Sequence, residues 1–492
     1  MALNAEVSYN AFLNHNIQTM RPSPTFAVAA KAAARKARGD VVYSFSVGEP
    51  SETTPDYVFD GKQKLLFSED PTTREKYRKM VSAYPPVGGL QILREAVRDK
   101  LADENGIAYD ASKEITVSTG GKQAIFNAFA VSLQKDDQVL IPEPSWVSYA
   151  DMVKWQGAKV VPVPTKPDFK FNAETLQLLL SEDKKHKTKW LVMNSPSNPT
   201  GAVYTKQELK DIARVIYDEN KRREQLNAQT NNEKLKLPPL MVLSDDIYEH
   251  MVYEDRYLNK PGDASAISNN VIMAAADEAI DGQPAFDMKP YTVIVNGNAK
   301  AFAMTGARVG YAAGPQQLIS KMTDFQGLVT SSGAAETQLA ATVALSRENK
   351  AAREAFFTKQ REAYTRRRNL VDEILNKDTS SSISFTPAPA AFYAMLDVTE
   401  MCKHLPTPTA GEENLRPANR LANLLVEKYG VALVPGDDFF ENPENQGRTF
   451  LRMSFATDEG TITKGLEALK QAEKDLVPEP SRRKSSQQAR AA

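Results

Sequence analysis

Cysteine is nearly absent from this sequence, which contains only Cys402 among its 492 residues. A single cysteine excludes an internal disulfide framework and is typical of a reducing compartment. The four histidines are scattered, so no cysteine and histidine group has the spacing of a zinc site, and we predict no bound metal.

The sequence also lacks an excess of charge and any long apolar run. The 61 Lys and Arg residues nearly balance the 62 Asp and Glu residues, which leaves no basic stripe for nucleic acid. No apolar run approaches the roughly 20 residues that span a bilayer. The N-terminal segment carries no visible targeting signal. We therefore expect a cytoplasmic protein without nucleic-acid or membrane partners.

Short apolar runs that alternate with helical patterns are what the middle of the chain does contain. Runs dense in Val, Ile and Leu suit strands that are buried on both faces of a sheet. Strands separated by helices predict an α/β domain with a mostly parallel sheet. The predicted strands are 114–118, 138–142, 159–164, 190–194, 240–244, 291–295 and 309–314.

A chain of this length suggests more than one domain. A charged helix predicted over 346–378 leads out of the first domain, and strand patterns at 390–398 and 449–456 indicate a second, smaller α/β domain. Polar loops or insertions are expected at 220–239 and 255–290. The predicted layout is an N-terminal arm (1–20), a small domain (21–60 and 346–476), a large cofactor-binding domain (61–345) and a disordered tail (477–492).

Candidate binding residues follow the predicted strands, and ligands of open α/β sheets bind at the carboxyl ends of strands. Gly120 and Gly121 stand where a strand meets a helix, a place that favours phosphate, although for these residues alone a tight turn is the better explanation. Trp146 follows the next strand and could stack on a flat ring or fill the core. Asn198 lies in NPTG, a strong turn sequence that could also present an amide to a ligand.

Charged and phenolic groups follow two further strands. Asp245 comes directly after an apolar run, where it needs a cationic partner or caps a helix. Tyr248 lies three residues later. The stretch NGNAKAFAMTGARVGYAAGP (296–315) isolates Lys300 among small residues with Arg308 close behind. An ordinary exposed loop lysine is the competing interpretation of Lys300.

Each of these signals is weak alone, but together they form a consistent set. An amine, a phosphate cradle with an arginine, an aromatic plate, a carboxylate, an amide and a phenol match one cofactor group for group. That cofactor is pyridoxal 5′-phosphate, which has an aldehyde, a phosphate, a flat ring, a ring nitrogen and a 3′-oxygen. We therefore predict pyridoxal 5′-phosphate as the cofactor.

Eight ordered motifs extend this prediction to a family. The chain resembles the class I aminotransferases of fold-type I pyridoxal-phosphate enzymes, and is most similar to the bacterial-type aspartate and prephenate aminotransferases. The resemblance runs from about Arg21 to about Leu469. Its motifs are RPSPTFAV, VGEPSETTPDYV, YPPVGGLQILREAV, VSTGGKQAIFNAF, NSPSNPTGAVY, LSDDIYEHMVY, NGNAKAFAMTGARVGY and LRMSFAT.

The resemblance implies a role for each residue around the cofactor ring. Lys300 resembles the Schiff-base lysine, which also serves as the general base. Asp245 would pair with the protonated ring nitrogen so that the ring accepts electrons. Asn198 and Tyr248 would hydrogen-bond the 3′-oxygen, and Trp146 would stack on the ring.

The resemblance also assigns residues to the cofactor phosphate. Arg308 and the backbone of Gly120 and Gly121 would hold it, with Lys122 beside them. Tyr84, in YPPVGG, resembles a tyrosine that reaches the phosphate of the neighbouring subunit. This correspondence implies a homodimer.

Substrate residues follow from the same resemblance. Gly48 and Arg452 would receive the α-carboxylate, because arginine presents a planar fork that binds carboxylates bidentately. Trp146 and Asn198 would also border the substrate. Lys122 resembles the lysine that meets a distal carboxylate, and the partner subunit would add hydroxyls from Thr330, Ser331 and Ser332. These features favour an amino donor such as aspartate or glutamate, a 2-oxo acid acceptor and ping-pong kinetics.

Three alternatives remain open from the sequence. Lys122 could instead be an exposed helix-start lysine, in which case the donor is aromatic or the specificity is broad. A lyase on the same cofactor shares the main site residues. A regulator without activity would usually carry a DNA-binding module, and none is evident. Asn298 and Ala390 depart from the family pattern and bear on the substrate range.

Overall fold

The structure is a computed structural model that describes residues 12–13, 24–262, 267–280, 282–378, 380–409 and 411–479. Most of the predicted N-terminal arm and nearly all of the predicted tail lie outside the described residues. The helices are α2 (Pro24–Ala37), α3 (Asp56–Leu66), α4 (Pro71–Ser82), α5 (Gln91–Asn105), α6 (Gly121–Ser132), α7 (Ser148–Trp155), α8 (Ala173–Glu182), α9 (Lys206–Asn227), α10 (Val271–Ala275), α11 (Gln316–Val329), α12 (Ala335–Leu345), α13 (Lys350–Leu375), α14 (Thr399–Lys403), α15 (Pro417–Leu424) and α16 (Glu459–Leu476).

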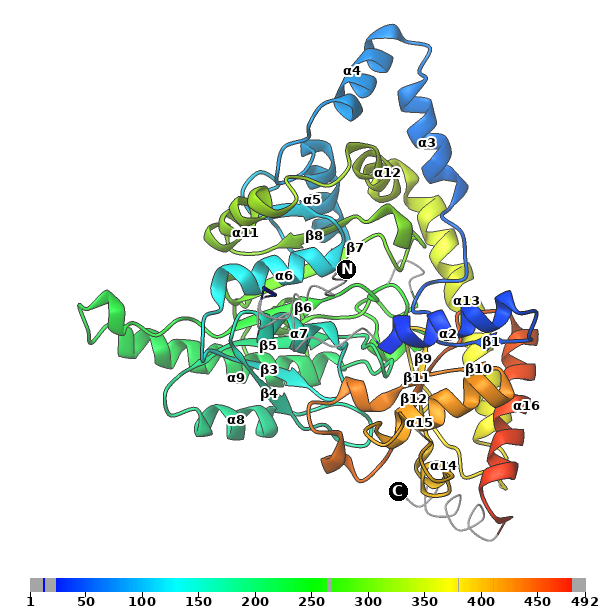
Figure 1. Ribbon diagram of the computed structural model, residues 1–492. Coiled ribbons are helices and arrows are strands. Elements are labelled where there is room, and N and C mark those ends of the chain that lie inside the picture. The colour runs from blue at the N-terminus through cyan, green and yellow to red at the C-terminus, as the bar shows by residue number, and fades with distance from the viewer. Residues whose placement is uncertain are drawn as a thin grey trace, which may run out of the picture.

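A twisted sheet forms the centre of the larger lobe (Figure 1). Within the described residues it has seven strands in the order β2-β8-β7-β6-β5-β3-β4. Only β8 runs antiparallel to its neighbours, so the predicted mostly parallel sheet is confirmed. The strands are β2 (Ile115–Ser118), β3 (Gln138–Pro142), β4 (Lys159–Val163), β5 (Thr188–Asn194), β6 (Met241–Asp245), β7 (Thr292–Gly297) and β8 (Gly310–Ala313).

Alternate residues of each central strand enter two different hydrophobic clusters. In β5, Trp190 and Val192 pack with α6, α7 and α11 on one face of the sheet. Leu191 and Met193 pack with α5, α8, α9, α10 and α12 on the other face. A strand covered on both sides needs apolar residues throughout, which is why these runs lack polar alternation.

A smaller lobe is built from both ends of the described chain. The strands β9 (Tyr393–Asp397), β11 (Val434–Pro435) and β12 (Phe450–Ser454) form one sheet, and β1 (Tyr43–Ser44) pairs with β10 (Val431–Ala432). Phe45 shares the cluster of α13, α15 and α16. By contrast, α3 contacts α12 of the larger lobe. The domain limits given above stay a prediction.

The two segments predicted as polar loops contain buried structure. Helix α9 continues to Asn227 because Asn220 and Arg223 are buried with partners, and Arg223 donates to the carbonyls of Thr188 and Pro238. Helix α10 lies inside the other segment and packs its apolar side chains into the core. Tertiary partners therefore overrode the polar composition, and both loop predictions are partly wrong.

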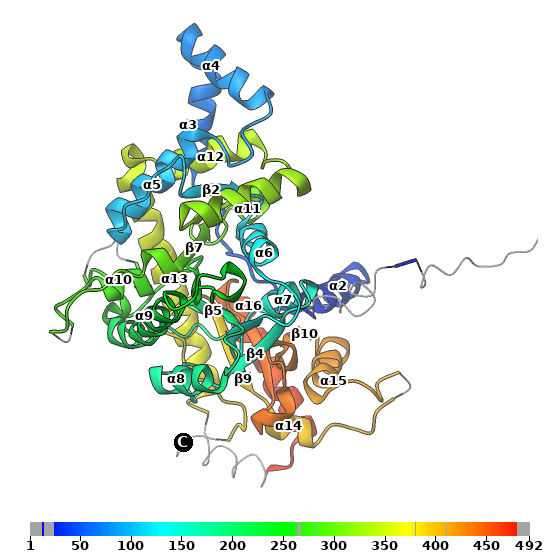
Figure 2. The same cartoon turned by 90° about the vertical axis from the view of Figure 1, so that its left-hand side faces the viewer.

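Helices α3 and α4 project away from the rest of the molecule (Figures 1 and 2). Val58 is the only buried residue of α3, and α4 has none. Asp70 caps α4 by accepting hydrogen bonds from the amides of Thr72 and Thr73. Among the described helices, none combines the length and the apolar character needed to cross a membrane.

Candidate active site

A cavity of about 350 Å³ lies where the carboxyl ends of the central strands face the smaller lobe. Its walls bring together residues that are far apart in the sequence. Among them are all but one of the predicted site residues: Gly48, Gly120, Gly121, Lys122, Trp146, Asn198, Asp245, Tyr248, Lys300, Arg308 and Arg452. The exception is Tyr84, which is 97% exposed and lies outside this cavity.

Lys300 follows β7 and points its ammonium into the cavity, where it donates a hydrogen bond to the carbonyl of Gly48. The competing interpretation of an exposed loop lysine is therefore wrong. Burial and the neighbouring Arg452 guanidinium lower the pKa of Lys300 from 10.5 to about 8. A lysine of this kind releases its proton near neutral pH and becomes a nucleophile or a base.

Asp245 is the last residue of β6 and is buried. Its Oδ2 atom accepts a hydrogen bond of 2.6 Å from the Tyr149 hydroxyl, and its backbone carbonyl accepts one of 2.8 Å from Asn194. Burial raises the pKa of Asp245 to about 6, against the opposing effect of Tyr149. A turn follows Asp245 instead of a helix, so the N-cap interpretation is wrong.

Backbone and arginine meet at the other end of the cavity. Gly120 has φ of 83°, and α6 begins at Gly121, so the N-terminus of this helix borders the cavity. A Cβ atom added at Gly120 would lie 2.6 Å from the Arg308 guanidinium. The backbone of Gly120 therefore lies directly beside the Arg308 side chain. A side chain on Gly310 would lie 2.2 Å from the Gly121 nitrogen. A helix N-terminus with an arginine beside it favours a phosphate.

Trp146 lines the cavity between two other site residues. Its ring meets the Tyr149 ring edge-on, with the centroids 5.2 Å apart. The Lys122 ammonium lies over the Trp146 ring, 4.8 Å from its centroid. Burial, with repulsion from Arg308, lowers the pKa of Lys122. Lys122 therefore lines the cavity beside Trp146, and the residue is also exposed to solvent.

Arg452 comes from β12 of the smaller lobe and is buried. It donates one hydrogen bond of 3.0 Å to the Asn198 side chain and another of 3.0 Å to the carbonyl of Ser46. Burial lowers the pKa of Arg452. Tyr248 shares a hydrogen bond of 2.9 Å with the hydroxyl of Tyr393, whose ring lies against the guanidinium of Arg452.

These groups fit pyridoxal 5′-phosphate. The amides of α6 with Arg308 suit its phosphate, and Lys300 suits its aldehyde. Asp245 is a buried carboxylate that forms no ion pair with any described residue, as a partner of a protonated ring nitrogen should be. Position 310 requires glycine, because a larger residue would displace the Gly120 and Gly121 backbone that suits the phosphate.

Comparison with known proteins agrees with this geometry. The family model for aminotransferases of class I and II matches residues 42–221 and 233–469. The chain belongs to this family. It is a pyridoxal-phosphate-dependent aminotransferase of fold-type I, so the predicted family, fold and cofactor are confirmed. The unmatched residues 222–232 fall inside the predicted insertion at 220–239.

Similar proteins include aspartate and aromatic aminotransferases. The aspartate/prephenate aminotransferase of Thermus thermophilus is 34% identical over 457 residues, which cover 92% of this chain and 97% of the relative. The solved aspartate aminotransferase of Thermus thermophilus with maleate has a TM-score of 0.72 at 32% identity, covering 94% and 99% of the two chains. An aromatic aminotransferase of Pyrococcus horikoshii has a TM-score of 0.68 at 29% identity, covering 90% and 99%.

The roles assigned from the family motifs leave out three residues of the site. Tyr149 contacts Asp245, Asn194 links β5 to β6, and Tyr393 contacts Tyr248. Asn194 could have been found, because it ends a predicted strand. Tyr149 stands three residues after Trp146 and resembles an ordinary core aromatic.

Neither residue that departs from the family pattern lines the cavity of the aminotransferase. Asn298 is buried, and neither polar atom of its side chain has a hydrogen-bond partner among the described residues. Ala390 is buried and forms an isolated bridge with Val252. The next residue, Ala391, has φ of 60°, so the left-handed position falls one residue after the expected glycine.

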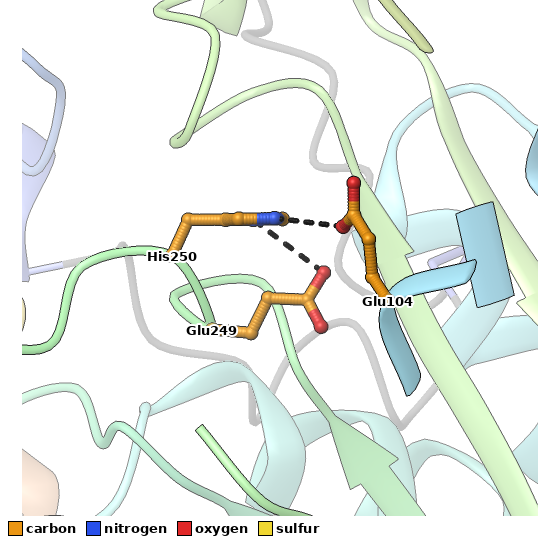
Figure 3. Close-up of side chains that lie close together, drawn as sticks. All are labelled: Glu104, Glu249 and His250. Atoms are coloured by element: carbon orange, nitrogen blue, oxygen red, sulfur yellow. Dashed lines mark hydrogen bonds and ion pairs between the residues drawn. The ribbon is translucent and has the colours of Figure 1, made fainter. Parts of the chain in front are cut away.

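A second group of buried charges lies beside the segment that carries Asp245. This buried ion cluster consists of Lys100, Glu104, Glu249, His250 and Arg353. Figure 3 shows His250 between the two carboxylates, with its Nε2 atom 3.0 Å from Glu104. Arg353 donates to Glu104 at 3.1 Å, and Lys100 contacts Glu249.

The buried ion cluster needs no metal ion. Burial alone would raise the pKa of Glu104, but the hydrogen bond from His250 and the nearby positive charges lower it to about 2. Lys100 and Arg353 already neutralise the two carboxylates. The cluster joins α5, α13 and the segment after β6, so its role is to hold these elements together.

Proposed function

We propose that this aminotransferase moves the amino group of an acidic amino acid, aspartate or glutamate, to a 2-oxo acid in two successive half-reactions. The observation that carries this proposal is an excess of positive charge in the cavity. Among the described residues that line it, four cations face two carboxylates, Glu49 and Asp245. The cations are Lys122, Lys300, Arg308 and Arg452. A phosphate and a dicarboxylate would complement them.

Arg452 suits the α-carboxylate. Among the described residues it forms no ion pair, and its Nε atom has no hydrogen-bond partner. A buried guanidinium without a counter-charge is costly and gains most from a ligand carboxylate. Its two existing hydrogen bonds, to Asn198 and Ser46, hold the fork in place before the ligand arrives.

Lys122 suits a distal carboxylate. It lines the same cavity as Arg452 but comes from α6 of the larger lobe, and it makes no ion pair with any described carboxylate. Two separated cations select a ligand with two separated carboxylates. The names of the similar Thermus thermophilus proteins, which refer to aspartate, support the same substrate class.

The chemistry of the site is divided among its residues. Pyridoxal 5′-phosphate supplies an aldehyde that binds amines and a ring that accepts electrons from the substrate Cα. Lys300 would provide the amine that holds the cofactor, and its neutral amine would move a proton at Cα. Asp245 would hold the ring nitrogen protonated, and Tyr248 and Asn198, which line the cavity, would hydrogen-bond the 3′-oxygen. Arg452 would orient the substrate, and Trp146 would stack on the ring.

An aromatic or broad donor range is the second candidate. Phe26 of α2 lines the cavity although its side chain is 73% exposed, which offers an apolar surface at the entrance. The similar Pyrococcus horikoshii structure is named an aromatic aminotransferase. In this reading Lys122 remains on the Trp146 ring and does not contact the substrate.

We also propose a homodimer in the cytoplasm. The projecting helices and their surroundings expose large apolar side chains that a second copy would cover: Phe59, Phe67, Tyr84, Leu328 and Val329. Tyr84 would then reach the phosphate end of the partner's cavity, and Thr330 to Ser332 would border it. The single free Cys402 supports a reducing compartment.

A donor screen tests the substrate proposal. Purified holoprotein is mixed with aspartate, glutamate, alanine, tyrosine or phenylalanine, and the cofactor absorbance and the 2-oxo acid product are recorded. Aspartate and glutamate should shift the absorbance at the lowest concentrations. In Lys122→Met, the response to aspartate should weaken about tenfold relative to alanine. A response to aromatic donors alone would overturn the acidic assignment, and products other than a 2-oxo acid would indicate a lyase.

A further inference from the structure

Tyr149 makes the shortest contact to the Asp245 side chain. The two residues are 96 positions apart in the sequence, and the hydroxyl lies 2.6 Å from Oδ2 of the carboxylate. Tyr149 is 1% exposed and Asp245 is 6% exposed. Among the described residues, the only other hydrogen bond to this carboxylate is a long one of 3.4 Å from the amide of Ile247. Tyr149 therefore sets the direction in which Asp245 points.

The surroundings of Tyr149 keep its hydroxyl protonated, so that it acts as a hydrogen-bond donor. Burial and the adjacent Asp245 charge raise the pKa of Tyr149 well above its ordinary value, so the hydroxyl keeps its proton and donates. Its ring packs edge-on against Trp146, which lines the same cavity. The position is thus fixed by packing on one side and by the carboxylate on the other.

We propose that Tyr149 is a positioning residue for the cofactor: its hydroxyl holds the Asp245 carboxylate ionised and aimed at the site of the ring nitrogen, while its ring supports the stacking face of Trp146. The inference rests on the role of Asp245 proposed above. It adds a residue that the family motifs did not single out, and it joins two contacts of the cofactor ring through one side chain.

The physical reason is the balance of forces on a buried carboxylate. Burial raises the pKa of Asp245 to about 6, and the Tyr149 hydrogen bond acts against this rise. The other ionisable groups near these two residues are Lys300, from the loop after β7, and Tyr248 and Asp246, from the segment that carries Asp245. Without the hydroxyl, Asp245 takes up a proton at higher pH. A neutral carboxyl cannot form a charge pair with the ring nitrogen.

The test compares two tyrosine-to-phenylalanine variants. Tyr149→Phe keeps the ring and removes the hydroxyl. Tyr204→Phe is the matched control, because the hydroxyl of Tyr204 is also buried, accepts one hydrogen bond of 3.1 Å from the Phe171 amide, and lies outside the cavity. For each variant we would measure thermal unfolding, the affinity of the apoprotein for pyridoxal 5′-phosphate, the absorbance of the bound cofactor and the pH profile of kcat/KM.

Tyr149→Phe should bind the cofactor about tenfold more weakly than the Tyr204→Phe control, the expected effect of losing one hydrogen bond to a charged group. The acid limb of its kcat/KM profile should move about one pH unit upward. Both variants should unfold at similar temperatures. If Tyr149→Phe keeps the cofactor affinity and the acid limb of the unmodified protein, the inference is wrong.

A double-variant experiment separates positioning from a purely structural role. If Tyr149 acts through Asp245, adding Tyr149→Phe to Asp245→Ala should change cofactor affinity by less than twofold. If the two effects multiply, Tyr149 acts independently and the inference fails. Failure of the unmodified protein to bind pyridoxal 5′-phosphate would instead refute the cofactor assignment itself, and the inference with it.

Discussion

The cavity and the buried ion cluster both contain several charged side chains, but they differ in whether the cations are paired with carboxylates. In the cluster, Lys100 and Arg353 each contact a carboxylate. In the cavity, Arg452 and Lys122 form no ion pair with any described residue. The two regions are adjacent, since Asp245 and Glu249 stand four residues apart in one segment.

This difference separates stabilisation from function. Breaking a buried ion pair removes a partner that is already present, so the folded protein loses stability. Removing an unpaired cation breaks no ion pair of the folded protein, so its stability changes little, whereas the affinity for an anionic ligand falls. Substitutions in the buried ion cluster should therefore lower stability, and substitutions in the cavity should weaken ligand binding.

The largest expected effect is on the amine of the cavity. Lys300→Ala should reduce transamination by at least about 10⁴-fold, because both the attachment of the cofactor and proton transfer at Cα are lost. Borohydride treatment of the holoprotein should label the unmodified chain at Lys300 and leave the variant unlabelled. Lys289→Ala, outside the cavity, serves as the control. Turnover retained in Lys300→Ala would refute the site.

The next effect concerns stability. Lys100→Met should lower the free energy of unfolding by about 3–5 kcal/mol, because Glu249 is left buried without its counter-charge. Lys321→Met breaks the exposed pair with Asp324 and should cost about 1 kcal/mol or less. Urea unfolding measures both. Equal losses would mean that the buried ion cluster contributes no more than a surface pair.

A smaller effect is expected for the Arg452 guanidinium, which is proposed to bind the α-carboxylate of the substrate. Arg452→Lys keeps the charge but loses the planar pair of donors, so kcat/KM for aspartate should fall about 10²-fold while the unfolding temperature stays within a few degrees. Steady-state kinetics and thermal unfolding check the two parts. Strong destabilisation would show that Arg452 belongs with the paired charges.

The last effect is a pH dependence, which substitutes no residue. Because the pKa of Lys300 is lowered to about 8, the neutral amine accumulates as pH rises through 8 instead of 10.5. Asp245 is ionised above about pH 6. Capture of pyridoxal 5′-phosphate by the apoprotein should therefore accelerate about tenfold per unit between pH 6 and 8, then level off. Stopped-flow absorbance measures it, and a rate still climbing at pH 10 would contradict an amine with a lowered pKa.

Strand-end reasoning placed much of the cavity in advance. Gly120, Asn198, Asp245 and Lys300 each follow an apolar run, and these runs form strands whose carboxyl ends share one edge of the sheet. These positions were predictable because buried strands have a strong sequence pattern and because the residues that follow parallel strands gather at one edge of the sheet.

Contacts between distant side chains were not predictable in this way. The hydroxyl of Tyr149 on Asp245 and the ammonium of Lys100 on Glu249 join segments that only the folded chain brings together. A tyrosine in a helix resembles core, and a lysine in a charged helix resembles surface. The helical residues up to Asn227 were missed for the same reason, since their polar side chains find partners elsewhere in the fold.

The smaller lobe has a consequence for how the protein is made. Phe45 packs against Gly465 of α16, closely enough that a side chain on this glycine would collide with its ring. The sheet of the larger lobe can assemble on the ribosome while synthesis continues, because all its strands precede residue 314. Phe45, by contrast, must wait for more than 400 further residues before its neighbour emerges, so an apolar N-terminal segment stays uncovered until translation is nearly finished.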